Sequence, residues 1–135
     1  MNKINLVIDK LFEHSGNLFE IIYDNNLQMP GMSFVSKDFR GINRYKIIIN
    51  YNLVKDEKIS VIAHILSHEW GHHILKHTIV DPSLLSNNEI LEKEIEADTY
   101  AYNFIKKYNY NIDDIENYIK KNFSYEIENF KSKLK

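Results

Sequence analysis

Four histidines and one glutamate lie within twelve consecutive positions, residues 66–77 (LSHEWGHHILKH). Residues 68–72 (HEWGH) match the pattern H-E-x-x-H. On a helix, side chains four residues apart lie one above the other, so His68 and His72 can each give a ring nitrogen to one metal ion. Glu69 is turned from them by about 100°, within reach of a water on that metal. Zinc lowers the pKa of such a water to about 7, and a nearby carboxylate can take its proton, which is the chemistry of amide hydrolysis.

Helical geometry separates the remaining histidines of this region from the metal face. His73 and His77 form a second pair four residues apart, rotated by more than about 100° from His68. We expect them to face solvent or a neighbouring helix, as bystanders, with a second and weaker metal site as the alternative. His64 lies one turn before His68, and we assign it a lining or structural role. Thr78 stands where a longer histidine motif would need its third histidine, so the third ligand must come from elsewhere.

The acidic candidates for that third ligand lie in residues 91–104 (LEKEIEADTYAYNF). On a helix, Glu94 and Asp98 share one face with two alanines, whose small side chains let this helix approach the histidine helix. Gly71 indicates the same close approach, because a glycine inside a helix costs about 1 kcal/mol. A catalytic zinc has three protein ligands and one open position. We therefore assign Glu94 as third ligand and Asp98 as the acceptor for the second ring N–H of a ligand histidine.

Two plainer interpretations compete with this assignment. The first segment could be a surface helix that happens to be rich in histidine, and the second an ordinary amphipathic helix with a solvated acidic edge. Each is reasonable for one segment alone. The two segments together, 22 residues apart and with alanines on the matching face, favour the metal site.

The predicted secondary structure indicates an α+β fold that is mostly helical and has a small antiparallel hairpin sheet. We expect a single domain over residues 1–135. Its parts are N-terminal helices and a hairpin (1–54), the histidine helix (56–77), the helix of the third ligand (89–108) and C-terminal helices (112–134). In detail, we expect helices at 3–13 and from Leu18, strands at 32–39 and 45–51, a helix at 57–77 capped by Asp56, a loop at 78–88, and helices at 112–122 and 124–134.

Composition narrows the class of protein. The chain has 135 residues, 44% hydrophobic residues, a net charge of −2 and no cysteine. Disulfides and cysteine metal sites are therefore excluded, and no basic excess indicates a nucleic acid partner. No stretch approaches the roughly 20 apolar residues of a membrane helix, and the N-terminus does not resemble a secretory signal. We expect a soluble cytoplasmic protein, with its oligomeric state left open.

The two motifs resemble those of the ImmA/IrrE metallopeptidases, approximately HExGH followed by ExxA(N/D)xFA. Residues 68–72 (HEWGH) and 94–101 (EIEADTYA) carry the resemblance, which extends back through residues 45–50 and forward into the helical tail. Asp98 stands where Asn is common in that family and Tyr100 where Phe is usual. The Leu-Met-Pro that often follows is missing, so the region after residue 101 departs from the family pattern.

This resemblance implies a minimal gluzincin-like zincin, in which one Zn²⁺ per chain is held by His68, His72 and Glu94 and Glu69 is the general base. It also implies a protein substrate, a helix-turn-helix repressor of a mobile element or phage. The competing function is a zinc-holding antirepressor that captures such a regulator without cutting it, and a third is a structural helical protein without metal. For the donor that stabilises the oxyanion, the sequence leaves four candidates: His64, His77, Tyr100 and Tyr102.

Overall fold

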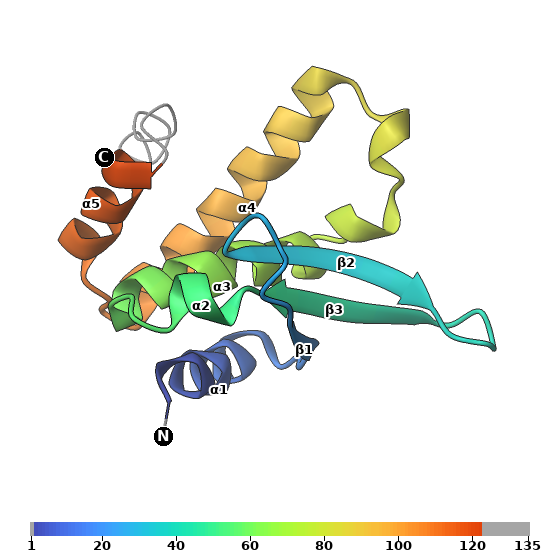
Figure 1. The fold of residues 1–135 in the computed structure, drawn as a ribbon. Helices are drawn as coiled ribbons and strands as arrows, with labels where there is room; N and C mark the ends of the chain where they lie inside the picture. The colour runs from blue at the N-terminus through green and yellow to red at the C-terminus, as the bar shows by residue number, and fades with distance from the viewer. Residues whose placement is uncertain (1, 123–135) are drawn as a thin grey trace.

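The computed structural model describes residues 2–122 as an α+β fold, mostly helical with a small sheet, as the sequence predicted (Figure 1). The helices are α1 (Lys3–Ser15), α2 (Tyr51–Val54), α3 (Ile59–Ile74), α4 (Asn87–Lys107) and α5 (Ile112–Asn122). The strands are β1 (Glu20–Tyr23), β2 (Gly31–Lys37) and β3 (Asn43–Ile49). Two short 3-10 helices, η1 (His77–Ile79) and η2 (Pro82–Leu84), join α3 to α4. The helix expected at 124–134 lies outside the described residues.

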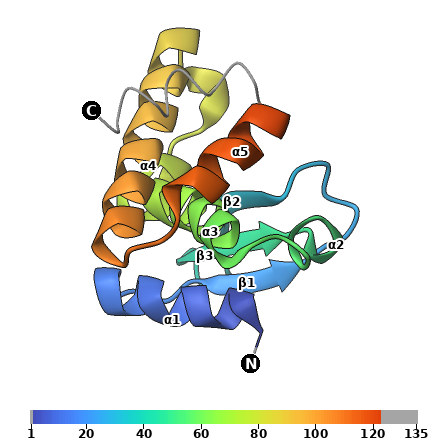
Figure 2. The ribbon, with the colours of Figure 1, turned by 90° about the vertical axis from the view of Figure 1, so that its left-hand side faces the viewer.

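Helix α3 is the centre of the fold. It contacts α1, α4, α5 and strands β2 and β3, and Figure 2 shows it between α1 below and α5 above. Most of its residues are buried, as expected for a helix surrounded by other elements. Trp70 is fully buried in the core, and its indole N–H donates to Ser15 Oγ of α1 at 3.1 Å. Trp70 therefore belongs to the core and ties α3 to α1.

The sheet has the strand order β1-β3-β2. Strands β2 and β3 form the predicted antiparallel hairpin, with Gly31 opposite Ile49 and Lys37 opposite Asn43. The helix expected from Leu18 is wrong, because residues 20–23 form β1 and pair in parallel with β3. A short apolar run fits both structures, and here the pairing with β3 decides. Among the described residues, no strand pairs with the outer edge of β2.

The histidine helix is shorter than predicted at both ends. Asn50 caps α2, and α3 begins at Ile59 after Lys58, which makes no side-chain capping bond, so Asp56 is not its N-cap. At the other end α3 stops at Ile74, because Lys76 takes a left-handed conformation with φ of 63°. His77 therefore belongs to η1 and not to the helix of His73.

Helix α4 starts within two residues of its predicted position. Ser86 and Glu89 form a capping box, in which the Ser86 side chain accepts from the Glu89 N–H and the Glu89 carboxylate accepts from the Ser86 N–H. The expected loop before it contains η1 and η2. Across the described residues, no helix has the length and apolar content that a membrane span requires.

Helices α3 and α4 approach each other closely at Gly71. A Cβ atom built on Gly71 would lie 3.0 Å from both Cβ and Cδ1 of Tyr100, closer than real Cβ contacts allow without movement. Ala97 and Ala101 of α4 are fully buried near this crossing. The close approach that the sequence indicated is therefore present, and the absent side chain of Gly71 permits it.

We expect Gly71→Ala to lower the free energy of unfolding by about 1–3 kcal/mol, because the added methyl group pushes Tyr100 and α4 away. This loss would appear although alanine is the better helix former by about 1 kcal/mol. Urea unfolding of the metal-free protein measures it. The double variant Gly71→Ala/Tyr100→Ala is the control, and it should lose less than the sum of the two single changes. A Gly71→Ala protein as stable as the wild type would contradict the account.

Candidate metal centre

Three side chains from two helices converge on one point between α3 and α4. His68 and His72 come from α3, and their Nε2 atoms lie 3.2 Å apart. Glu94 comes from α4, with Oε2 at 2.9 Å from His68 Nε2 and Oε1 at 3.3 Å from His72 Nε2. The potential ligand atoms all lie within 4.8 Å of one another. These three residues, which the sequence selected, therefore form a group that can bind a metal ion.

Asp98 lies behind the group, one turn beyond Glu94 on α4. Its Oδ1 is 2.7 Å from His68 Nδ1, the ring nitrogen that faces away from Glu94. A carboxylate in this position fixes the ring orientation and leaves Nε2 free to bind a metal. The structure thus brings together the predicted ligand residues and the predicted hydrogen-bond acceptor.

The electrostatics of the group are those of a site prepared for a cation. Burial by itself lowers the pKa of His68, but the hydrogen bonds with Asp98 and Glu94 outweigh it and raise this pKa well above its ordinary value. Burial opposes ionisation of Glu94, yet its bonds with His68 and His72 hold its pKa well below the usual range. Positive charge is therefore favoured at this point, and a bound metal ion would take the place of the proton.

Glu69 lies outside this group and is held from the side of the sheet. Its Oε1 accepts a hydrogen bond from Ser33 Oγ of β2 at 3.1 Å. Its Cγ would be 3.5 Å from a Cβ atom on Gly31, at the start of the same strand. Glu69 therefore lies beside β2, whose outer edge pairs with no other strand within residues 2–122.

Comparison with known proteins adds a family to this geometry. The family model Peptidase U49 matches residues 5–122. The chain belongs to the Peptidase U49 family. No curated protein and no solved structure matches it. The match spans α3, α4 and the hairpin, and it confirms the coarser part of the resemblance, a peptidase.

In this Peptidase U49 chain, the expectation that His73 and His77 face solvent or a neighbouring helix is wrong for His73, which contacts β3, and holds in part for His77, which contacts Glu96 of α4. His73 is buried, with Nδ1 at 2.8 Å from Thr78 Oγ1 and Nε2 at 2.8 Å from the Lys46 carbonyl oxygen of β3. His77 is also buried, and its Nδ1 lies 2.9 Å from His72 Nδ1. These positions depend on β3 and η1, two segments outside α3. A helical projection of α3 does not include them.

Sequence reasoning also missed Ser33. It lies on β2, 36 residues before the glutamate that it contacts, and a single serine in a strand carries no signal of its own. The only sequence indication was the prediction of a strand there. Whether Ser33 contacts Glu69 depends on how the hairpin packs against α3, and spacing along the chain does not predict that packing.

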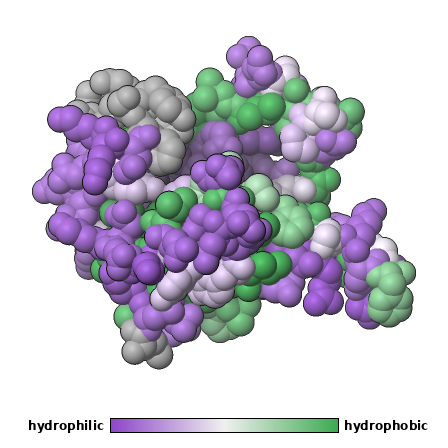
Figure 3. All heavy atoms as spheres, viewed as in Figure 1, coloured by the Kyte–Doolittle hydropathy of each residue, from purple (hydrophilic) through white to green (hydrophobic). Residues whose placement is uncertain are grey.

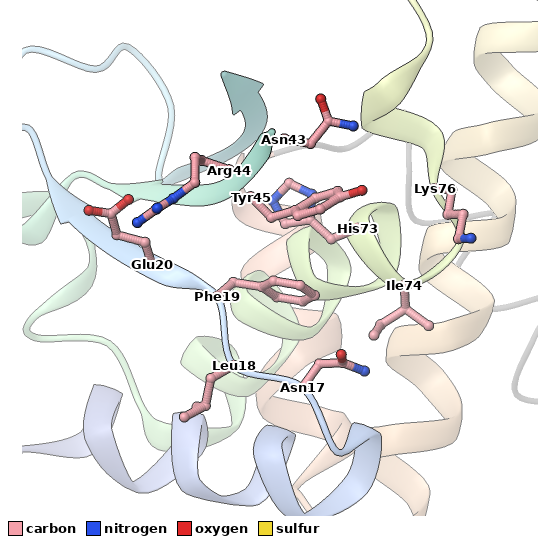
Figure 4. Close-up of a pocket in the computed structure, with 10 residues that line it drawn as sticks. All are labelled: Asn17, Leu18, Phe19, Glu20, Asn43, Arg44, Tyr45, His73, Ile74 and Lys76. Atoms are coloured by element: carbon pink, nitrogen blue, oxygen red, sulfur yellow. The ribbon is translucent and has the colours of Figure 1, made fainter. Parts of the chain in front are cut away.

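A cavity of about 490 Å³ lies away from the metal group, between the starts of β1 and β3 and the end of α3 (Figure 4). Phe19, Tyr45 and His73 form its aromatic wall. It contains neither Glu69 nor any of the three possible metal ligands. This cavity is therefore separate from the group of possible metal ligands.

Apolar side chains are exposed on the segment that leads to Glu94. Ile90 and Leu91, one turn before it on α4, are 39% and 56% exposed. Others lie in the connection from α3: Leu75, Ile79, Val80 and Leu84. Figure 3 shows hydrophobic residues among the hydrophilic surface on one face of the molecule. The connection from α3 to Glu94 thus exposes several apolar side chains.

His64 lies one turn before His68, with a half-buried side chain. Burial, together with the neighbouring His68, lowers its pKa to about 4. The folded protein therefore keeps this imidazole neutral over a pH range in which the unfolded chain would protonate it. This fits the expected lining or structural role.

We expect His64 to make the metal-free protein sensitive to acid. Below about pH 6.5 the unfolded chain takes up a proton at His64 while the folded protein does not, so the free energy of unfolding falls as the pH drops from 6.5 towards 4. The contribution is up to about 3 kcal/mol. Urea unfolding at several pH values in this range, for wild type and His64→Gln, measures it. The variant should lose less stability on acidification, and parallel curves would contradict the assignment.

Proposed function

We propose that this Peptidase U49 chain is a zinc-dependent endopeptidase, in which His68, His72 and Glu94 hold one zinc ion and Glu69 is the general base. The observation that carries the proposal is the spacing of the three possible ligands. Two ligands at about 2.0–2.1 Å from a tetrahedral zinc ion lie about 3.3 Å apart. The measured separations are 3.2, 2.9 and 3.3 Å. Two imidazoles and one carboxylate are also a ligand set that suits zinc.

The proposed mechanism assigns a separate task to each side chain. Bound zinc would supply a Lewis acid for the peptide carbonyl and lower the pKa of the attacking water. Glu69 would take a proton from that water while its oxygen forms the new C–O bond to the carbonyl carbon, and would then pass the proton to the amine nitrogen as the C–N bond breaks. Ser33 holds Glu69 Oε1 during this transfer, and Asp98 keeps the His68 ring in the orientation that presents Nε2.

The substrate is proposed to bind as an extended peptide along the outer edge of β2. Backbone hydrogen bonds to an unpaired strand edge give such a peptide affinity and register. Glu69 faces this strand through Ser33, so a peptide on the edge would have a carbonyl close to the base. The resemblance to ImmA/IrrE proteins supports a cytoplasmic helix-turn-helix repressor of a mobile element or phage as the protein substrate.

The alternative is a regulator that holds zinc and captures a repressor without cutting it. The carboxylate of Glu69 argues against this function, because a site kept for structure does not need a base next to it. The third possibility, a structural protein without metal, conflicts with the close spacing of the three possible ligands.

We expect about one zinc ion per chain in the wild-type protein and strong loss of zinc in Glu94→Ala, because the third ligand is removed. Elemental analysis after zinc loading and desalting measures it. Glu92→Ala is the matched control, since Glu92 is an exposed carboxylate on the same helix and outside the possible ligand group. Absence of zinc from the wild type after loading would refute the enzyme proposal.

We expect Glu69→Gln to keep its zinc and its fold but to lose peptidase activity by about 10²–10⁴-fold, because glutamine cannot take the proton. The amide oxygen can still accept the Ser33 hydrogen bond, which makes the change a local one. Cleavage of a repressor encoded beside this protein, followed by intact mass, is the measurement. If Glu69→Gln inactivates the repressor as well as the wild type does, without fragments, the capture function is favoured instead.

A further inference from the structure

Two ligand histidines are proposed, and each has a partner on its second ring nitrogen. Asp98 is the partner of His68 and was expected from the sequence. The partner of His72 was not. We infer that His77 is a positioning residue for His72, and that Glu96 in turn orients His77, so that a chain His72–His77–Glu96 holds the second ligand. This inference rests on the proposed function in one respect, that His72 binds the metal through Nε2.

The contacts along this chain are short and lie mostly inside the protein. His72 Nδ1 and His77 Nδ1 are 2.9 Å apart, and both side chains are buried, with exposures of 8% and 9%. The two rings meet edge to face, with centroids 5.2 Å apart and an angle of 64° between their planes. On the far side of His77, Nε2 lies 3.4 Å from Glu96 Oε1, whose side chain is more than half exposed. The chain thus runs from the metal group to the surface of α4.

The positions of the protons follow from the metal site. A neutral imidazole that gives Nε2 to a metal carries its proton on Nδ1. His72 Nδ1–H must therefore donate to His77 Nδ1, which has to be unprotonated in order to accept. The proton of His77 then lies on Nε2, directed towards Glu96. Each link has one donor and one acceptor, and the carboxylate at the end favours this direction over the reverse.

The backbone after α3 is built to bring His77 into this position. In a continuous helix, a residue five positions after His72 would be rotated from it by about 140° and could not reach it. The chain instead reverses at Lys76, whose φ of 63° is unusual for a residue with a side chain. Such a conformation is unfavourable by itself and persists where surrounding contacts fix it.

A contact next to His77 fixes this reversal. Thr78 Oγ1 lies 2.8 Å from His73 Nδ1, and His73 itself is held to β3 through the Lys46 carbonyl. Successive residues of η1 therefore contact successive histidines of α3, His77 with His72 and Thr78 with His73. The two histidines that were expected to be bystanders keep η1 and the ligand His72 in a fixed relation.

Zinc affinity tests the inference, measured by competition with a chromophoric chelator. Loss of an outer partner of a ligand histidine typically costs 10–100-fold in metal affinity, and we expect a loss of this size in His77→Ala. His77→Gln should recover most of it, because its amide oxygen can accept from His72 and its amide N–H can donate to Glu96. Glu96→Gln should weaken binding less than His77→Ala, and Glu92→Gln, an exposed carboxylate on the same helix, is the matched control.

The outcomes separate this inference from the proposed function. A wild-type protein that binds no zinc overturns the proposed function itself. A wild type that binds zinc, with His77→Ala binding it equally well, overturns the role of His77 alone. A His77→Gln variant no better than His77→Ala would also count against it, because a purely steric role for the histidine ring would give that result.

A second measurement does not require a variant to fold. In the zinc-loaded wild type, nitrogen-15 NMR of the imidazoles should show His72 protonated at Nδ1 and His77 protonated at Nε2 only. The His72 Nδ1–H should exchange slowly with solvent. A proton on Nδ1 of His77 in the loaded wild type would overturn the inference, whatever the zinc affinities of the variants.

Discussion

The close contact between α3 and α4 is the constraint on which the site depends. The possible ligands are divided between these helices, two histidines on one and a carboxylate on the other, and their separations of about 3 Å exist only while the helix axes stay close. Gly71 lies between His68 and His72 in the sequence, and Tyr100 occupies the space that its side chain would take. Gly71, which permits the close approach of α3 and α4, is therefore itself a residue of the H-E-x-x-H motif.

Helix α3 combines two roles that ordinarily conflict. It is the most buried helix of the fold, yet its second half carries three histidines, and polar groups are costly to bury unless they have partners. Its apolar half, from Ile59 to Leu66, packs into the core. Its histidine half is buried against polar atoms: carboxylates of α4, the hydroxyl of Thr78 and the carbonyl of Lys46. Each of these partners comes from outside the helix, so the fold around α3 is needed to keep it buried.

Sequence reasoning succeeded where a single helix period decides the answer. His68, His72, Glu94 and Asp98 were selected by faces of two helices, and those faces are local properties. It failed where distant segments decide. Residues 20–23 form a strand because they pair with β3, which lies more than 20 residues further along the chain. The chain reversal at Lys76 places His77 beside His72, where a continuous helix would have directed it elsewhere. Residue spacing does not predict a left-handed backbone conformation at a lysine, because this conformation is usual for glycine or asparagine.

The four carboxylates near the histidines differ in their neighbours and not in their chemistry. Glu94 contacts two imidazoles, Asp98 one, and Glu96 one that is itself a step further from the metal group. Each of these three carboxylates therefore lies beside an imidazole, a group that can carry positive charge. Glu69 instead accepts from the neutral hydroxyl of Ser33. The Ser33 hydroxyl is uncharged, so it can orient the Glu69 carboxylate without forming an ion pair with it. The carboxylate that is proposed to take and return a proton is thus the one of the four that is anchored by an uncharged side chain, on the side where we propose that a peptide enters.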